Sequence, residues 1–458
     1  MVLNGVTVTS QITCFKAYDA RGRVPDELNI DVVYRIGRAY AAFLQPRKVV
    51  IGYDIRLSSP DLTEALANGL MDSGVDVYDI GLCGTEQVYF ATFHANMDGG
   101  IMVTASHNPP DYNGLKFVRE DAKPLSGNNG LQDIRRLAEE NQFTDVINHG
   151  QRHTLNVDDA YIEHLLSYVD RALLKPLKIV VNAGNGSAGT VIDRLETQLP
   201  FEFIKLQHTP DGTFPHGVPN PLLPENRGIT ADSVREHGAE LGIAWDGDFD
   251  RCFLFDERGT FVEGYYIVGL LAQAMLERSA GEAIVHDPRL IWNSIEMIEA
   301  HGGTPVQSVS GHSFMKQKMR EVNAVYGGEM SAHHFFRDFA YCDSGMIPWL
   351  LVTQIMCVEA KSLTEMVGER QRKYPTSGEI NRKVDDVQAT IARIEAKYAD
   401  RAKHLDHTDG LGVEFDDWRF NIRGSNTEPL IRLNVESRGD PEQVRQATAE
   451  LLALIEQS

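Results

Sequence analysis

A strand-like segment followed by a helix-like segment begins three times along this chain of 458 residues. The strand-like segments are "KVVIGYD" (48–54), "LKIVV" (177–181) and "EAIVHDP" (282–288). Short apolar runs that alternate with helical segments are typical of a parallel or mixed sheet covered by helices. The pattern therefore predicts an α/β protein with three similar mixed α/β domains, bounded near residues 155 and 260.

The pattern changes near residue 370, where the polar stretch "RQRKYPTSGEINRKV" contains the proline and glycine typical of a linker. An expected helix, a strand–loop–strand unit and a final amphipathic helix follow it. These features predict a smaller α+β C-terminal domain. The expected architecture is four domains around a central cleft, comprising residues 1–155, 156–260, 261–370 and 371–458.

Composition narrows the class of partner. Sixty-five acidic against 44 basic residues give a formal net charge of −21, which argues against nucleic acid but allows small phosphorylated ligands. The N-terminus lacks the features of a signal peptide, and the longest apolar stretch (346–358) is too short and too polar to span a membrane. The sequence leaves monomer and homodimer open. Five scattered cysteines without a CxxC pair favour reduced thiols and a cytoplasmic location: Cys14, Cys83, Cys252, Cys342 and Cys357.

Ser106 lies at the end of an apolar strand, in the segment "IMVTASHNPPDYNGLK" (101–116). Its hydroxyl fits either a turn or cap residue or a covalent carrier of a phosphoryl or acyl group. His107 is not its base merely because it is adjacent, since neighbours in an extended chain point to opposite faces. The GxSxG motif of hydrolases is absent, which disfavours an acyl-enzyme.

Three aspartates alternate in "DGDFDR": Asp246, Asp248 and Asp250. Converging carboxylate oxygens suit Mg²⁺, and without a cation they would repel one another between the apolar runs "LGIAW" and "CFLF". An EF-hand is excluded, because Arg251 stands where that loop requires glycine and the flanking segments are strand-like. The loop therefore predicts a magnesium site, with a solvated acidic turn as the alternative.

Two further polar loops contain ligand-binding side chains. In "GGEMSAHHFF" (327–336), the alternating Glu329, Ser331 and His333 would share one side of an extended loop and could bind vicinal sugar hydroxyls. Taken alone, this loop favours a structural hydrogen-bond network over a sugar site. "RGSNTEP" (423–429) combines a guanidinium, two hydroxyls and an amide in one turn, which favours a phosphate site over a plain hairpin loop.

A literal GxGxxG stands at residues 184–189 after a strand. A dinucleotide site would require an acid at the end of the next strand, but "FEFIKLQH" (201–208) has none, and Asp211 falls in a turn. We therefore expect these glycines to form a tight strand–helix turn at a domain interface. A dehydrogenase remains a poorly supported alternative.

Together, and in this order, the loops resemble those of the α-D-phosphohexomutase family over nearly the whole chain. "TASHNPPDYNGLK" is similar to the family's phosphoserine loop, "DGDFDR" to its magnesium loop, "GEMSAH" to its sugar loop, "RGSNTEP" to its phosphate loop and "FKAYDARG" (15–22) to its N-terminal segment. The resemblance implies interconversion of mannose 6-phosphate and mannose 1-phosphate through a phosphoserine and a hexose 1,6-bisphosphate, with Mg²⁺, supplying GDP-mannose for polysaccharide synthesis. Alternatives are a phosphoglucomutase or dual-specificity phosphohexomutase, a metal-dependent sugar phosphatase and a non-catalytic sugar-phosphate binder.

The resemblance also implies roles for single residues. Lys116 is the expected general base, because nearby cations would lower its pKa, and Arg21 is its rival. Three positions depart from the family pattern and leave the sugar preference open: Arg289 replaces a lysine, Ala332 a glycine and Glu86 a proline. The resemblance implies that Ser106 carries the phosphoryl group and binds the metal together with Asp246, Asp248 and Asp250. The reacting phosphoryl group would be contacted by His107, Lys116, Arg21 and Arg251, and the sugar by Glu329, Ser331, His333 and His312. The distal phosphate would be bound by Arg423, Ser425, Asn426 and Thr427, with Tyr18 and Arg289 as further candidates.

Overall fold

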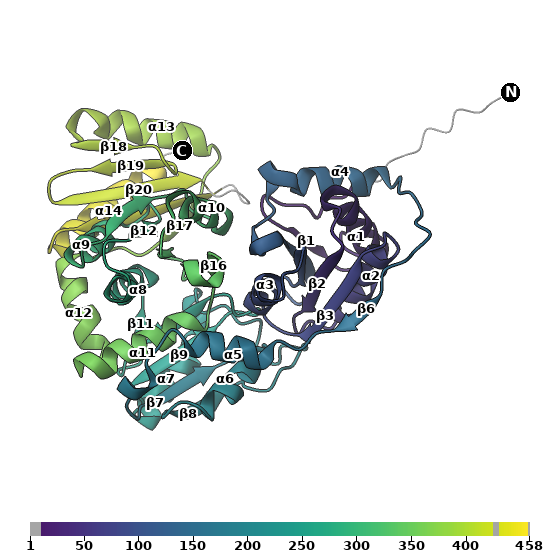
Figure 1. Cartoon of the computed structure of the whole chain (residues 1–458). Helices are drawn as coiled ribbons and strands as arrows, with labels where there is room; N and C mark the ends of the chain where they lie inside the picture. The colour runs from purple at the N-terminus through teal and green to yellow at the C-terminus, as the bar shows by residue number, and fades with distance from the viewer. Residues whose placement is uncertain (1–10, 425–429, 457–458) are drawn as a thin grey trace.

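The computed structural model describes residues 11–424 and 430–456. Four β-sheets follow one another along the chain, and their domains form an arc in which domain I lies at the right, domain II at the bottom, domain III at the left and domain IV at the upper left (Figure 1). Three sheets are mixed and the fourth is antiparallel, which confirms the predicted fold class.

The domain I sheet has the strand order β1-β5-β4-β2-β3-β6. Strands β4, β2, β3 and β6 run parallel, and β5 and β1 are added antiparallel at one edge. The central strand β2 is buried along its middle because its residues are apolar on both faces. The elements are β1 (Ala20–Arg23), α1 (Ile30–Leu44), β2 (Lys48–Tyr53), α2 (Ser59–Met71), β3 (Asp76–Leu82), α3 (Thr85–His94), β4 (Gly99–Val103), β5 (Tyr112–Arg119), α4 (Gln132–Glu140) and β6 (Arg152–Thr154).

The domain II sheet has the order β11-β10-β9-β7-β8, in which β9, β7 and β8 are parallel. The GxGxxG glycines form the turn from β7 into α6, as expected. A Cβ at Gly189 would lie 2.3 Å from the carbonyl oxygen of His208, and Ser187 donates a hydrogen bond across to domain I. The elements are α5 (Asp158–Leu166), β7 (Lys178–Asn182), α6 (Ala188–Glu196), β8 (Glu202–Leu206), α7 (Gly228–His237), β9 (Leu241–Trp245), β10 (Cys252–Phe255) and β11 (Phe261–Val262).

The domain III sheet has the order β13-β12-β14-β15-β16, again with a parallel part and an antiparallel edge. Its helix α11 contains the long apolar stretch and is buried on nearly every side. Among the described residues, no helix is both long and apolar enough to cross a membrane. The elements are α8 (Gly264–Arg278), β12 (Ala283–His286), α9 (Trp292–Ala300), β13 (Thr304–Gln307), α10 (His312–Val322), β14 (Tyr326–Gly328), β15 (His334–Phe336), β16 (Cys342–Asp343), α11 (Ile347–Glu359) and α12 (Leu363–Lys373).

Domain IV is a five-stranded antiparallel sheet with two helices and its own hydrophobic core. In contrast, one continuous core cluster joins parts of domains I, II and III. Domains I, II and III thus share part of their packing, and domain IV is packed separately. The elements are β17 (Ile380–Lys383), α13 (Val387–Tyr398), β18 (His404–Asp406), β19 (Leu411–Glu414), β20 (Trp418–Gly424), β21 (Leu430–Ser437) and α14 (Pro441–Ile455).

Candidate active site

Ser106 follows β4 in a turn that directs its hydroxyl toward domain II. Its backbone is in the left-handed region, with φ of 47°, and its N–H donates to Thr104 Oγ1 at 2.9 Å. The hydroxyl donates to Asp246 Oδ2 at 3.0 Å, although the two residues are 140 positions apart in the chain. The serine is 4% exposed. The structure therefore brings the predicted carrier and the predicted magnesium loop together.

The loop between β9 and β10 holds the three aspartates, all buried. One carboxylate oxygen from each lies within 4.8 Å of the others. The Oδ1 atoms of Asp248 and Asp250 are buried without a hydrogen-bond partner among the described residues. Gly247 allows the loop to close on the serine, because a Cβ there would lie 2.5 Å from the carbonyl oxygen of Ser106. Hard oxygen donors with free lone pairs fit a magnesium ion.

Two cations balance these carboxylates. Arg251 donates to Asp246 Oδ2 from Nε at 2.9 Å and from Nη2 at 2.6 Å. Lys116 Nζ lies 2.7 Å from Asp248 Oδ2 and 2.6 Å from Asp250 Oδ2. Burial disfavours the ammonium, but the two carboxylates outweigh it and raise the pKa of Lys116. The expected lowering of this pKa was wrong, because carboxylates and not cations are its nearest neighbours.

The two aspartates beside Lys116 differ. Burial opposes ionisation of both, but Lys116 holds the pKa of Asp248 well below its usual value. Burial and the charge of Asp248 raise the pKa of Asp250 to about 6. A carboxylate with this much repulsion is one that a divalent cation would stabilise.

His107 does not form a hydrolytic triad with the serine. Its Nδ1 lies 2.8 Å from Arg251 Nη2 and 3.2 Å from Ser106 Oγ. Burial and then the charge of Arg251 lower its pKa well below the ordinary value, so the ring is neutral and Nδ1 accepts from the guanidinium. Arg21 approaches from β1 and donates to Asn108 Oδ1 and Asp19 Oδ2, each at 2.6 Å.

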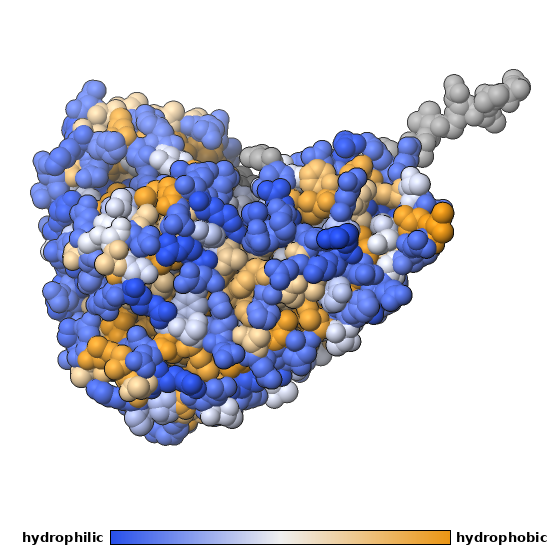
Figure 2. All heavy atoms as spheres, in the orientation of Figure 1, coloured by the Kyte–Doolittle hydropathy of each residue, from blue (hydrophilic) through white to orange (hydrophobic). Residues whose placement is uncertain are grey.

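A cavity of about 870 Å³ collects groups from all four domains. The outline of the molecule is hollowed between domain I at the right and domains III and IV at the left (Figure 2). Of the predicted residues, the cavity lining includes both the carrier serine and the expected general base. Its full lining is Lys16, Ala17, Tyr18, Asp19, Arg21, Ser106, His107, Asn108, Tyr112, Lys116, Asp250, Arg251, His312, His333 and Arg432.

The predicted sugar loop is a tight turn between β14 and β15, so the expectation of an extended loop was wrong. Ala332 N donates to Glu329 O at 3.0 Å, and Ala332 has φ of 69°. Glu329 accepts from Gly311 N at 2.8 Å, and Ser331 accepts from Arg289 at 3.4 Å. His333 lines the cavity, whereas Glu329 and Ser331 are not in its described lining.

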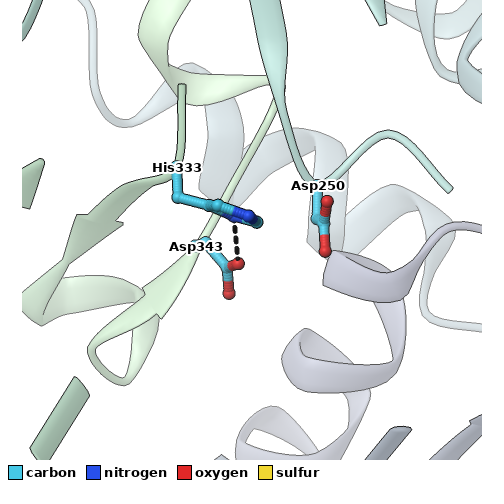
Figure 3. A group of neighbouring side chains, drawn as sticks. All are labelled: Asp250, His333 and Asp343. Atoms are coloured by element: carbon cyan, nitrogen blue, oxygen red, sulfur yellow. Dashed lines mark hydrogen bonds and ion pairs between the residues drawn. The ribbon is translucent and has the colours of Figure 1, made fainter. Parts of the chain in front are cut away.

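His333 is held by a buried pair of charges. Its Nδ1 lies 2.9 Å from Asp343 Oδ2, and Lys316 Nζ lies 2.6 Å from Asp343 Oδ1. Figure 3 shows the ring between Asp343 and Asp250. These three side chains are close enough to hold a metal, but both oxygens of Asp343 already have cationic or N–H partners. Burial disfavours the imidazolium, yet Asp343 and Asp250 outweigh it and raise the pKa of His333.

Of the other predicted ligand-binding residues, Tyr18 lines the cavity, whereas Arg289 and Arg423 are not in its described lining. Tyr18 lines the cavity with its ring 5.4 Å from that of His312. Arg289 is buried and pairs with Asp287 at 2.6 Å; it is not in the described lining. Arg423 is also buried and lies 3.6 Å from Asp409. Three predicted phosphate ligands lie outside the described residues: Ser425, Asn426 and Thr427.

The sequence interpretation missed Arg432. This residue of β21 lines the cavity, stands directly opposite Arg423 of β20 and pairs with Glu379 at 3.1 Å. A charged residue inside an apolar strand, just after a predicted phosphate loop, is the signal that could have identified it.

The serine, Asp250 and the surrounding cations line one cavity, an arrangement that suits the transfer of a phosphoryl group. Four family models, described as domains I, II, III and the C-terminal domain of phosphoglucomutase/phosphomannomutase, match residues 13–145, 159–259, 263–374 and 379–454. The chain belongs to this family and is an isomerase of the phosphohexomutase type.

Similar proteins agree with this assignment. A phosphomannomutase of Escherichia coli is 59% identical over 454 residues, which cover 97% of this chain and 100% of that protein. A protein named phosphohexose mutases from Xanthomonas campestris pv. campestris is also 59% identical, with 97% and 99% covered. A crystal structure of a phosphoglucomutase/phosphomannomutase family protein from Burkholderia thailandensis matches with a TM-score of 0.87 at 33% identity, covering 98% of each chain.

Proposed function

We propose that this chain interconverts mannose 6-phosphate and mannose 1-phosphate through a phosphorylated Ser106. The observation that carries the proposal is the 3.0 Å contact between the Ser106 hydroxyl and Asp246, inside a cavity lined by cations. Ser106 gives its phosphoryl group to the free hydroxyl of the hexose monophosphate, and the hexose 1,6-bisphosphate returns the other one. We further propose a cytosolic location, which the five unpaired cysteines support.

The residues present fit a magnesium ion. Asp246, Asp248, Asp250 and an oxygen on Ser106 would hold it. When bound, this ion neutralises charge that develops on the phosphoryl group. Lys116 and Arg251 pair with these aspartates and bring positive charge to the same place. Arg21 and Arg251 line the cavity and can contact phosphoryl oxygens with planar N–H groups.

The sequence left Lys116 and Arg21 as candidates for the general base, and the geometry adds His333. Lys116 has its proton held by two carboxylates, so we assign it to charge stabilisation. His333 has the geometry of a general base, because Asp343 binds Nδ1 and leaves Nε2 for the attacking hydroxyl. We therefore propose that His333 accepts the hydroxyl proton and returns it in the reverse direction. Arg21 serves the phosphoryl group.

Domain IV would bind the phosphate that does not react. Arg432 lines the cavity and Arg423 stands opposite it on the neighbouring strand. One site can serve both orientations of the bisphosphate, since a phosphate lies there in each. We assign Ser425, Asn426 and Thr427 to the same phosphate, and the sugar hydroxyls to Glu329, Ser331, His333 and His312, with Tyr18 and Arg289 beside them.

Mannose is the proposed main substrate because the E. coli relative named phosphomannomutase is 59% identical over nearly the full chain. Its 1-phosphate would supply GDP-mannose synthesis. The equally similar relative named phosphohexose mutases favours dual specificity as the second candidate, because glucose and mannose differ only at C2.

A side-by-side assay tests the proposal. Purified protein is given mannose 1-phosphate or glucose 1-phosphate, with and without Mg²⁺ and a trace of glucose 1,6-bisphosphate. We expect isomerisation that requires Mg²⁺, a higher kcat/KM for mannose, and an added phosphate on Ser106 by intact mass. Release of inorganic phosphate without isomer would indicate a phosphatase, and binding without either product would indicate a sugar-phosphate binder.

A further inference from the structure

Arg56 lies buried beneath the serine loop. It stands between β2 and α2, is 1% exposed and ranks among the largest fully buried side chains of the described residues. Its Nη1 donates to Pro109 O at 2.7 Å and Tyr112 O at 2.9 Å. Its Nη2 donates to Ser106 O at 2.9 Å and Asn108 O at 2.6 Å. Four carbonyls of the loop thus converge on one guanidinium.

The opposite side of Ser106 is held through Asp54. The Nε of Arg56 lies 3.3 Å from Asp54 Oδ2. The same oxygen accepts from the Thr104 hydroxyl at 2.7 Å, and Thr104 Oγ1 accepts from Ser106 N at 2.9 Å. Both backbone polar groups of Ser106 therefore have fixed partners. This explains how a non-glycine residue is kept at φ of 47°.

Only arginine among the side chains suits this position. Its five N–H groups point outward in a rigid plane, whereas lysine offers three donors from a single atom. The ring of Phe214, from domain II, covers the guanidinium at 5.4 Å. Because the site is closed to water, carbonyls left unpaired there would cost about 1–3 kcal/mol each.

We infer that Arg56 is a positioning residue for phosphoryl transfer, which holds the turn that presents Ser106 Oγ to Asp246. The inference rests on the proposed function for its catalytic consequence. Arg56 is not in the described lining of the cavity, so it acts through the serine loop and not on the substrate. Thr104 and Asp54 complete the same support.

The test compares Arg56→Lys with Arg38→Lys. Arg38 is also buried in domain I and donates to Tyr34 and Thr144, away from the serine loop. We expect Arg56→Lys to lower kcat about 100-fold, as for a reacting group misplaced by about 1 Å, with KM for mannose 1-phosphate little changed. Phosphorylation of Ser106 by glucose 1,6-bisphosphate should slow equally. Arg38→Lys should retain wild-type kcat.

Thr104→Val provides a second variant if Arg56→Lys does not fold. It removes the hydroxyl between Asp54 and Ser106 N while keeping the side-chain shape. We expect a lower kcat that Thr104→Ser restores, since serine keeps the hydroxyl. Wild-type kcat in Thr104→Val, or an equal loss in Arg56→Lys and Arg38→Lys, would overturn the inference.

Hydrogen exchange separates this inference from the proposed function. The amides of residues 104–108 should exchange faster in Arg56→Lys than in wild type or Arg38→Lys. If the wild-type protein isomerises neither hexose phosphate, the proposed function fails, and the exchange result still decides whether Arg56 holds the loop. Unchanged exchange in Arg56→Lys would refute the positioning role.

Discussion

The reaction side and the phosphate side of the cavity are built differently. Domains I, II and III share one continuous core cluster, which includes Phe249 of the aspartate loop that contacts Ser106. Domain IV has a separate core and contributes Arg432 from its own sheet. Under the proposed function, the reacting group is therefore held in a fixed position, whereas the distal phosphate binds to a separately packed unit.

The largest expected effect is on the reaction side. Ser106→Ala removes the proposed carrier and should lower kcat by at least about 1,000-fold, as expected for loss of a nucleophile, while leaving domain IV intact. The measurement is isomerisation of mannose 1-phosphate, with intact mass to follow phosphorylation. Ser73→Ala, at the end of α2, is the matched control. A Ser106→Ala protein with near-normal turnover would contradict the phosphoserine mechanism.

The next largest effect is on the stability of the contact between domain IV and domain III. Glu436 of domain IV is fully buried and bonds Arg419, Ile291 N and the Tyr265 hydroxyl. Glu436→Gln leaves Arg419 buried without its counter-charge and should lower the free energy of unfolding by about 3–5 kcal/mol. Calorimetry should then resolve a separate, earlier transition for domain IV.

The control for Glu436→Gln is the same substitution at an exposed pair of domain IV. Glu442→Gln, beside Arg445 on α14, should leave the unfolding of domain IV almost unchanged, because solvent screens an exposed ion pair. A single unshifted transition in Glu436→Gln would show that domain IV does not depend on this contact.

A smaller effect is expected on the phosphate side. Arg432→Met should raise KM for mannose 1-phosphate about 10-fold, or about 1.4 kcal/mol of binding, with kcat changed little. Steady-state kinetics measure both constants. Arg382→Met, at a half-buried position of the neighbouring strand β17 where the arginine pairs with Glu456, is the control. A loss confined to kcat would instead place Arg432 on the reaction side.

The last effect depends on pH and concerns Glu86, which joins domain I to domain III. Its Oε2 accepts from Gly345 N and Met346 N, and its Oε1 accepts from the hydroxyls of Tyr161 and Ser344. Burial raises its pKa to about 8, against the pull of these four donors. The folded protein therefore holds this proton more tightly than the unfolded chain does.

The sign of the pH effect follows from this raised pKa. The stabilisation is complete below the unfolded pKa of about 4.5 and is lost as the pH rises through about 8, at up to about 1.4 kcal/mol per pH unit. Glu86→Gln should flatten this part of the curve, because the amide does not titrate in this range. The amide can fill the same bonds when the hydroxyls accept, so the fold is kept. Denaturant unfolding at pH 5 to 9 measures it. An identical pH slope in both proteins would exclude Glu86 as the source.

The sequence predicts those parts of the fold and of the candidate site that depend on residues close together in the chain. Strand and helix periodicity identifies the three mixed domains, because apolar patterning is local. The aspartate loop is equally local, since three ligands fall within five residues. In both cases the chemistry can be inferred from residues that are neighbours in the chain.

Features that depend on residues far apart in the chain cannot be predicted from local sequence patterns. The pKa of Lys116 rises because of carboxylates more than 130 residues away. The four bonds of Arg56 end on a loop 50 or more residues later, and Arg432 enters the cavity only through its pairing in a sheet. The sugar loop was predicted as extended because alternation of side chains does not reveal a turn with a left-handed alanine.

The close approach at Gly247 limits how the enzyme can open. Since even a Cβ would lie 2.5 Å from the Ser106 carbonyl, the loops of domains I and II touch backbone to backbone and form a single unit. Under the proposed mechanism, the room that a bisphosphate needs to turn around must therefore come from another part of the cavity wall. Domain IV has its own core, so we expect any opening movement to occur there while the first two domains keep their relative position.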